Sequence, residues 1–152
     1  MSYNPKGIGE NSEAQIMACF LKHGKVVLQP FGDNQRYDMV VDENGNFIRV
    51  QCKTGLMEKR LGGRAFVFPT CSTNWNTRKN KTYEGDADVF AVYLREDDSV
   101  YIIPVESAPK KSCIIRMKKS SRHRVAKGKV TRMAEDYIFD PNISLMDYPK
   151  GS

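Results

Sequence analysis

The feature that most constrains this chain is the dipeptide Asn44-Gly45, which lies between two segments of mixed apolar and polar residues. A two-residue type I′ turn needs positive φ at both positions, and Asn-Gly tolerates this conformation well. The sequence therefore predicts a β-hairpin with strands at 37–42 and 47–53. In this register residue 43 opposes residue 46, and Asp38 opposes Gln51 across the strand pair.

Alternation along the two strands assigns the side chains of the hairpin to two faces. We expect an apolar face that joins the core, formed by Tyr37, Met39, Val41, Ile48, Val50 and Cys52. The opposite face places Asp38, Gln51 and Lys53 together at the end away from the turn, where opposed Cβ atoms lie about 5 Å apart.

The chemistry of this polar face favours a divalent cation. Carboxylate, amide and carbonyl oxygens are hard ligands of the kind that Mg²⁺ accepts, so Asp38, Gln51 and the main-chain carbonyl of Cys52 are candidate metal ligands. Lys53 is the candidate to neutralise charge on a phosphate in the transition state or to help deprotonate a water. These roles together indicate phosphodiester hydrolysis. The spacing alone is equally typical of a hairpin whose polar face lies in solvent.

A helix is predicted before the hairpin, from about Pro5 to His23, with Gly24 as its C-terminal stop. Counting back from Leu21 through Met17 and Ala14 reaches Glu10, at the start of the face that we expect to pack on the protein. Two interpretations of this acid stay open. It is either an N-terminal acid favoured by the helix dipole or a carboxylate that points into a site.

The 152 residues indicate one domain, spanning 1–152, with an α/β architecture: a central mixed β-sheet flanked by α-helices. Further strands are expected at 25–28, 65–69, 88–94 and 100–104, a long loop at 69–83 and a late helix near 130–139. Asp86 and Asp88 are expected to form local hydrogen bonds rather than to bind metal. Without a signal pattern or a long apolar run, and with four widely spaced cysteines, we expect a soluble cytoplasmic protein with reduced thiols and no membrane partner.

Positive charge is concentrated in one segment. Residues 110–132 contain ten Lys or Arg and no Asp or Glu, whereas the rest of the chain has 14 basic and 18 acidic residues. Such a segment favours a polyanionic partner, because Lys and Arg beside phosphates release condensed counterions. The alternative is a solvated or disordered basic tail.

The order "GIGENSEA", "YDMVVD" and "RVQCKTG" resembles the PD-(D/E)xK nuclease superfamily, and within it the small endonucleases encoded in group I introns of the cyanobacterial type. The resemblance covers roughly 7–105. It implies the PD-(D/E)xK (restriction-endonuclease-like) fold and a catalytic set of Glu10, Asp38, Gln51 and Lys53, with Glu10 binding the metal directly or through water. Tyr37 stands where the motif has proline, and Gln51 where most relatives have Glu or Asp.

This resemblance implies a Mg²⁺-dependent, site-specific endonuclease of the homing type, with Mn²⁺ able to substitute, that acts on double-stranded DNA as a homodimer or a dimer of dimers. The candidate DNA contacts are the basic residues of two regions: Lys110, Lys111, Arg116, Lys118, Lys119, Arg122, Arg124, Lys127 and Lys129 in the basic segment, and Arg78, Lys79 and Lys81 near Trp75. Two alternatives remain. One is a structure-specific nuclease such as a Holliday junction resolvase, and the other is a catalytically silent DNA-binding module of the same fold.

Overall fold

The computed structural model describes residues 4–60, 63–117 and 131–151. Its elements in chain order are helix α1 (Pro5–Lys22), strands β1 (Val26–Leu28), β2 (Met39–Glu43), β3 (Asn46–Thr54), β4 (Leu56–Arg60), β5 (Gly63–Pro69), β6 (Cys71–Asn74), β7 (Lys79–Thr82), β8 (Val89–Leu94) and β9 (Ser99–Pro104), a 3₁₀ turn η1 (Val105–Ser107), strand β10 (Ser112–Arg116) and helix α2 (Ala134–Tyr137).

The centre of the fold is a five-stranded sheet in the order β1-β2-β3-β8-β9. Strands β3 and β8 run parallel, and the other neighbouring pairs run antiparallel. The sheet is therefore mixed, as the sequence predicts. Because β8 is buried along its whole length, the sheet has a continuous apolar centre with packed layers on both faces.

The β2–β3 hairpin has the predicted turn and register. Asn44 and Gly45 have φ values of 53° and 92°, and the pairing of Val41 with Ile48 and of Glu43 with Asn46 follows the predicted alignment. Asp42 Oδ1 accepts a hydrogen bond of 2.7 Å from the N–H of Gly45, which holds the turn closed. This register fixes which end of the hairpin carries residues 38 and 51–53.

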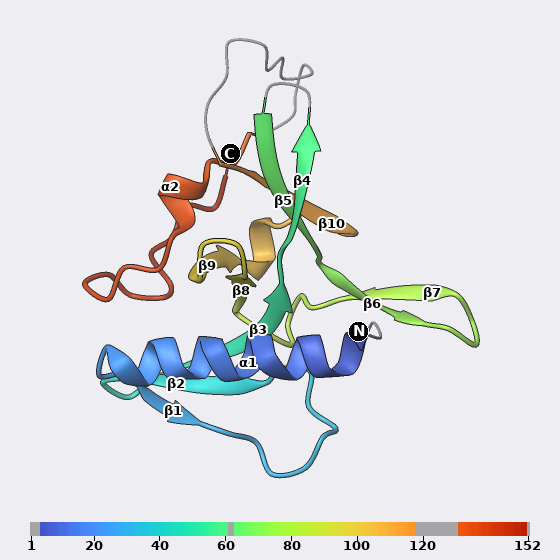
Figure 1. Ribbon diagram of the computed structural model, residues 1–152. Helices are drawn as coiled ribbons and strands as arrows, with labels where there is room; N and C mark the ends of the chain where they lie inside the picture. The colour runs from blue at the N-terminus through green and yellow to red at the C-terminus, as the bar shows by residue number, and fades with distance from the viewer. Residues whose placement is uncertain (1–3, 61–62, 118–130, 152) are drawn as a thin grey trace.

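Helix α1 lies along one face of this sheet (Figure 1). Asn4 caps its N-terminus through Gly7, and Gly24 follows its last turn with a φ of 76°. Its buried residues are Ser12, Ile16 and Phe20, which follow one another at i and i+4. The predicted packing face was wrong, because Ala14 and Leu21 are exposed.

The opposite face of the sheet is covered mainly by a second, three-stranded antiparallel sheet, β10-β5-β4. A helix was expected there from residues 130–139, but α2 spans only Ala134–Tyr137 and adds Ala134 and Tyr137 to that core. Side chains crowd Gly55, where a Cβ would lie 3.1 Å from Phe66 and 3.2 Å from Val92. Gly55 therefore lets the chain pass directly from β3 into β4.

The segment between Pro69 and Tyr83 is not the predicted long loop. It forms the β6–β7 hairpin, which projects away from the central sheet (Figure 1). Trp75 lies in its turn and is 85% exposed, so it is not a core residue. Both strands consist almost entirely of polar residues, so the segment lacks the alternation of apolar and polar residues that indicates a strand. The two strands were missed for this reason.

Three further features concern the cysteines, the C-terminal residues and the length of the helices. All four cysteines are free thiols. Leu145 is buried and Phe139 packs against the α1 core, whereas Ile138, Ile143 and Met146 are exposed, so the C-terminal segment both caps the core and presents apolar surface. Among the described residues, no helix has the length and apolar character needed to cross a bilayer.

Candidate active site

Asp38 lies directly before β2, at the end of the hairpin away from the turn. Its N–H donates to the carbonyl of Val50 at 2.8 Å, and its Oδ2 accepts from the N–H of Cys52 at 2.8 Å. These two bonds tie Asp38 across β3, one residue on each side of Gln51. The carboxylate is therefore anchored beside the 51–53 segment, as the predicted hairpin requires.

The helix residue nearest to this carboxylate is Glu13, not Glu10. Glu13 and Asp38 line the same hollow of about 300 Å³, together with residues of the 29–37 loop. Glu10 is exposed one turn earlier on the helix. Nor does the dipole interpretation hold for Glu10, because the first turn of α1 contains no acidic residue.

Burial raises the pKa of both carboxylates, and the pKa of Glu13 is raised further by neighbouring acids. The pKa of Glu13 is raised by desolvation, by the charge of Asp38 and by that of Glu10. The pKa of Asp38 is also raised, because desolvation outweighs the opposing effects of the Cys52 N–H and the Lys53 cation. Two acids that resist ionisation side by side are electrostatically suited to receive a cation.

Cys52 follows Gln51 in β3, and the charges of both acids act on its thiol. Burial raises the pKa of its thiol well above the ordinary value, and the charges of Asp38 and Glu13 raise it further. The Cys52 side chain thus remains a neutral thiol that packs against the α1 core, while its N–H holds Asp38. Because a neutral, buried thiol is a poor metal ligand, the main-chain carbonyl is the part of Cys52 that suits the predicted metal site.

Lys53 also acts electrostatically on Asp38. Its positive charge lowers the pKa of Asp38, in opposition to the larger effect of burial. Its Nζ donates to the hydroxyl of Tyr83 at 3.1 Å and lies 4.7 Å from the centre of the Tyr83 ring. The amine is therefore held near Asp38 by an aromatic residue that follows β7.

Gln51 is half-buried in β3, in register with Phe90 of β8. Within the described part of the chain its amide makes no hydrogen bond, which leaves the amide oxygen available to a ligand. The structure brings Asp38, Lys53 and Glu13 into electrostatic contact, with Gln51 between the two residues of β3 that bond Asp38.

Two hollows adjoin this cluster. The first, of about 300 Å³, has an acidic lining that includes Glu13, Asp33 and Asp38. The second, of about 420 Å³, is mostly apolar and runs from Ile8 of α1 past Lys53 and Thr54 to Pro69. The hydroxyls of Ser12 and Thr54 lie 2.6 Å apart and fasten α1 to β3 beside the site. An acidic hollow next to a lysine-lined one can receive a cation and an anion side by side.

The donor set fits a hard divalent cation. It would offer the carboxylates of Glu13 and Asp38, the amide oxygen of Gln51 and the main-chain carbonyl of Cys52. Among the residues that the structure describes, no group of three His, Cys, Asp or Glu side chains could hold a metal, so a cation here would depend on amide and carbonyl oxygens as well as on carboxylates.

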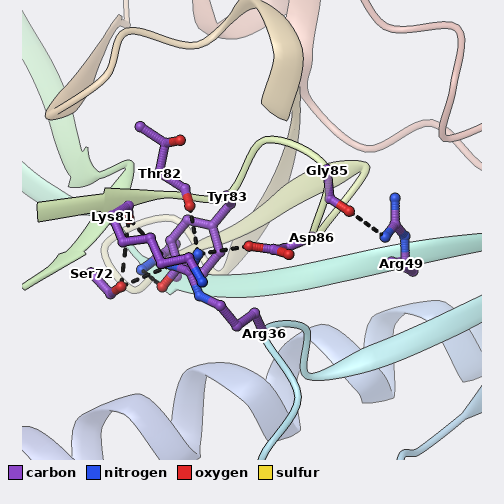
Figure 2. Close-up of polar contacts among 9 residues, drawn as sticks. Arg36, Arg49, Ser72, Lys81, Thr82, Tyr83, Gly85 and Asp86 are labelled. Atoms are coloured by element: carbon purple, nitrogen blue, oxygen red, sulfur yellow. Dashed lines mark hydrogen bonds and ion pairs between the residues drawn. The ribbon is translucent and has the colours of Figure 1, made fainter.

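Asp86 and Asp88 are engaged in ion pairs. Asp86 accepts from Arg36 at 2.8 Å, and Asp88 accepts from the backbone and side chain of Arg49. Arg49 also donates to the carbonyl of Gly85 (Figure 2). Both carboxylates form the hydrogen bonds that were predicted, although the side-chain partners are distant in sequence rather than local. Desolvation acts to raise the pKa of Asp88, but the hydrogen bonds from Arg49 outweigh it and leave that pKa lowered.

The predicted DNA contacts are only partly described. Arg78, Lys79 and Lys81 are exposed on the β6–β7 hairpin, and Lys110 and Lys111 are exposed before β10. Arg116 is half-buried at the end of β10. The predicted contacts Lys118, Lys119, Arg122, Arg124, Lys127 and Lys129 lie outside the described residues. Arg132 is a structural residue, since it is buried and donates to the carbonyl of Ser107 at 2.8 Å.

Sequence reasoning missed Glu13, Arg36 and Tyr83. Glu13 could have been found, because it lies three residues before Ile16 and seven before Phe20, the spacing of a single helix face. Arg36 and Tyr83 carried no comparable signal. Their contact is set by tertiary structure across 47 positions of sequence.

A mixed sheet with two half-buried acids and a lysine at the end of a central hairpin is the arrangement that the predicted nuclease superfamily implies. The model of the PD-(D/E)XK endonuclease family matches residues 3–140, and the chain belongs to this family. The predicted superfamily and α/β fold class are thereby confirmed.

One solved structure is similar over nearly its whole length. It is the bacterial homing endonuclease I-Ssp6803I, with 24% identity, a TM-score of 0.70 and coverage of 90% of this chain and 89% of that chain. This likeness establishes the same fold. No curated protein was found to match the sequence.

Proposed function

We propose that this protein is a Mg²⁺-dependent, site-specific endonuclease that hydrolyses phosphodiester bonds of double-stranded DNA. The observation that carries the proposal is the convergence of Glu13 and Asp38, two carboxylates with raised pKa values, beside the amine of Lys53. Membership of the PD-(D/E)XK endonuclease family supplies the reaction class.

The proposed metal site consists of Asp38, Gln51 and the Cys52 carbonyl, with Glu13 in place of the predicted Glu10 as the helix acid. A bound Mg²⁺ or Mn²⁺ would lower the pKa of a water and polarise the phosphate. Gln51 contributes a neutral oxygen, so the site has one negative charge fewer than a site with a carboxylate at that position. Mg²⁺ itself, rather than another divalent ion, is part of the proposal.

The protein groups have separate roles in the hydrolysis. Water oxygen forms a bond to phosphorus while the bond from phosphorus to one sugar oxygen breaks, leaving a phosphate end and a hydroxyl end. Lys53, held by Tyr83 beside Asp38, stabilises the negative charge that builds on the phosphate oxygens. Asp38, fixed by the Cys52 N–H, orients the attacking water.

Several features support duplex DNA as substrate and homing as the type of activity. The exposed cations of the β6–β7 hairpin and of the β10 approach offer contacts to phosphates. The structurally similar I-Ssp6803I is named a bacterial homing endonuclease. Cutting both strands requires two active sites, and each chain has one, so a homodimer or a dimer of dimers is part of the proposal.

Two alternatives remain distinguishable. A junction resolvase would share the catalytic residues and differ in the DNA shape that it recognises, and a silent binding module is favoured only by Gln51. The test incubates the protein with linear duplexes of random sequence and with four-way junctions, in Mg²⁺ and in Mn²⁺. We expect cuts at defined duplex sequences. Preferential cutting of junctions of any sequence would select the resolvase, and binding without cutting, by wild type and Gln51→Glu alike, would select the silent module.

A further inference from the structure

Tyr83 lies between two cations that come from different parts of the chain. Lys53 Nζ is 3.1 Å from the Tyr83 hydroxyl and 4.7 Å from the ring centre, and the guanidinium carbon of Arg36 is 4.2 Å from the same ring centre. A cation near an aromatic ring is attracted by the ring quadrupole, and a charged donor strengthens its hydrogen bond to the hydroxyl. The ring and the hydroxyl therefore both restrain the Lys53 amine.

Core packing and main-chain hydrogen bonds restrain Tyr83 itself. Its ring packs edge-on against Phe90 with centres 5.6 Å apart, and the side chain is 6% exposed. Its carbonyl accepts from the N–H groups of Asp86 and Ala87 at 2.9 and 3.0 Å. The main chain and the core therefore hold Tyr83 in place independently of its contact with Lys53.

Arg36 completes the restraint, because both of its terminal guanidinium nitrogens donate to partners around Tyr83 (Figure 2). Nη1 donates to the Thr82 carbonyl and, at 2.8 Å, to Asp86, while Nη2 donates to Ser72 Oγ at 2.8 Å and to the Lys81 carbonyl at 3.2 Å. These partners lie on β6, on β7 and in the turn after Tyr83. Arg36 therefore locks the base of the β6–β7 hairpin against the ring that holds Lys53.

We propose that Tyr83, braced by Arg36, is a positioning residue that sets the place of the Lys53 amine in the active site. A reacting group held by a rigid partner loses less freedom when the substrate binds, and small misplacements of such groups slow catalysis strongly. The role of Lys53 in this inference rests on the proposed nuclease activity. The contact between Lys53 and Tyr83 does not depend on it.

The first test measures the contact without requiring DNA cleavage. Brief acetylation with acetic anhydride, followed by mass spectrometry, reports how freely the Lys53 amine meets the reagent. Tyr83→Phe keeps the ring and removes only the hydroxyl, and we expect Lys53 to be acetylated about tenfold faster in this variant. The matched control is Tyr101→Phe, which removes a hydroxyl of the same core that bonds Asp97 instead. Equal Lys53 acetylation in wild type and Tyr83→Phe would overturn the inference.

The second test measures the consequence for catalysis. At saturating duplex DNA we expect Tyr83→Phe to lower the single-turnover cleavage rate about tenfold, with the Kd for DNA and the Tm near those of wild type and no loss in Tyr101→Phe. A loss of rate that follows a loss of affinity or of Tm would show a merely structural role and overturn the inference. Failure of the wild-type protein to cut any DNA would refute the proposed function, whereas the acetylation result would still decide whether Tyr83 holds Lys53.

Discussion

At the residue scale, α1 contains two candidates for the acid beside Asp38, Glu10 and Glu13. Glu10 occupies the position that the motif order suggests, yet it is exposed, whereas Glu13 shares a hollow with Asp38 and has a raised pKa. The difference of three residues is nearly one helical turn, so the two acids occupy neighbouring positions on the helix. Their similarity makes them a matched pair for mutation.

We predict that Glu13→Gln lowers the DNA cleavage rate by about 10- to 100-fold, because it removes a carboxylate from the proposed metal site. Glu10→Gln removes the same charge from an exposed position and should change the rate less than about threefold. Single-turnover cleavage with saturating DNA measures both. A larger loss in Glu10→Gln than in Glu13→Gln would restore Glu10 as the site residue.

The raised pKa of Asp38 also predicts a cost in stability. A carboxyl with a raised pKa binds its proton more tightly in the folded state than in the unfolded state, so stability falls as the pH rises through that pKa. Asp38→Asn removes the charge and keeps an oxygen that accepts from the Cys52 N–H. We predict a higher Tm for the variant than for the metal-free wild type at pH 7, and each 1 kcal/mol shifts the Tm of such a chain by roughly 2–4 °C.

Thermal unfolding over a pH series measures this difference. The advantage of Asp38→Asn should shrink as the pH falls and vanish below the ordinary Asp pKa of 3.8, where Asp38 is neutral in the folded and the unfolded state. A variant that is less stable than the metal-free wild type at pH 7, or an advantage independent of pH, would show that the Asp38 charge is not strained in the free protein.

At the element scale, the β6–β7 hairpin is fastened to the active site through Arg36. Arg36 bonds both strands of the hairpin and contacts the Tyr83 ring that holds Lys53. The hairpin displays Trp75, Arg78, Lys79 and Lys81 on its exposed part. A contact between this hairpin and DNA would therefore act on an element that is joined to Lys53, the proposed catalytic lysine.

We predict that Arg36→Lys loosens the hairpin, because lysine keeps the charge but cannot make the forked set of hydrogen bonds. Backbone amides of β6 and β7 should exchange with solvent about tenfold faster, as measured by hydrogen–deuterium exchange. Arg49→Lys is the control, since it weakens a comparable cluster around Asp88 without touching the hairpin. Equal exchange in Arg36→Lys and wild type would mean that strand pairing alone holds β6 and β7.

Salt dependence tests the basic surface of the hairpin. If Arg78, Lys79 and Lys81 each neutralise a phosphate, replacing all three with Gln reduces the slope of log K against log salt by about 0.9 for each phosphate that is no longer neutralised. Fluorescence anisotropy with a labelled duplex at several salt concentrations measures the slope. An unchanged slope would remove the hairpin from the DNA interface.

The elements show how far the sequence alone could lead. The Asn44-Gly45 hairpin was predictable in turn and register, because a two-residue turn fixes the alternation of both strands. Its core face was predictable except at Tyr37, which lies before β2 and packs against the core on the opposite face of the sheet. The same logic brought Asp38, Gln51 and Lys53 to one end. It failed for β6 and β7, whose polar side chains carry no periodic signal. It also failed for the layer that covers the second face, where β10 pairs with β5 across a long sequence separation.

At the scale of the whole molecule, two sheets and one long helix converge on the end of β3. Helix α1 brings Glu13 to one side, and β8 and the segment after β7 bring Phe90 and Tyr83 to the other. Lys53 is the residue at which these layers meet, because it acts on Asp38 and contacts Tyr83. The fold thus explains why a site of few residues needs contributions from distant parts of the chain.

The central claim is that the Asp38 and Lys53 cluster cuts duplex DNA at chosen sequences. The most direct measurement incubates wild type, Lys53→Ala and Asp38→Asn with a duplex library of random sequence in Mg²⁺ and sequences the new ends, with binding to the same library measured in parallel. We predict ends that share a defined sequence for wild type, none above background for either variant, and nearly unchanged binding for all three. Equal cutting by either variant, or no cutting by wild type in Mg²⁺ or Mn²⁺, would contradict the claim.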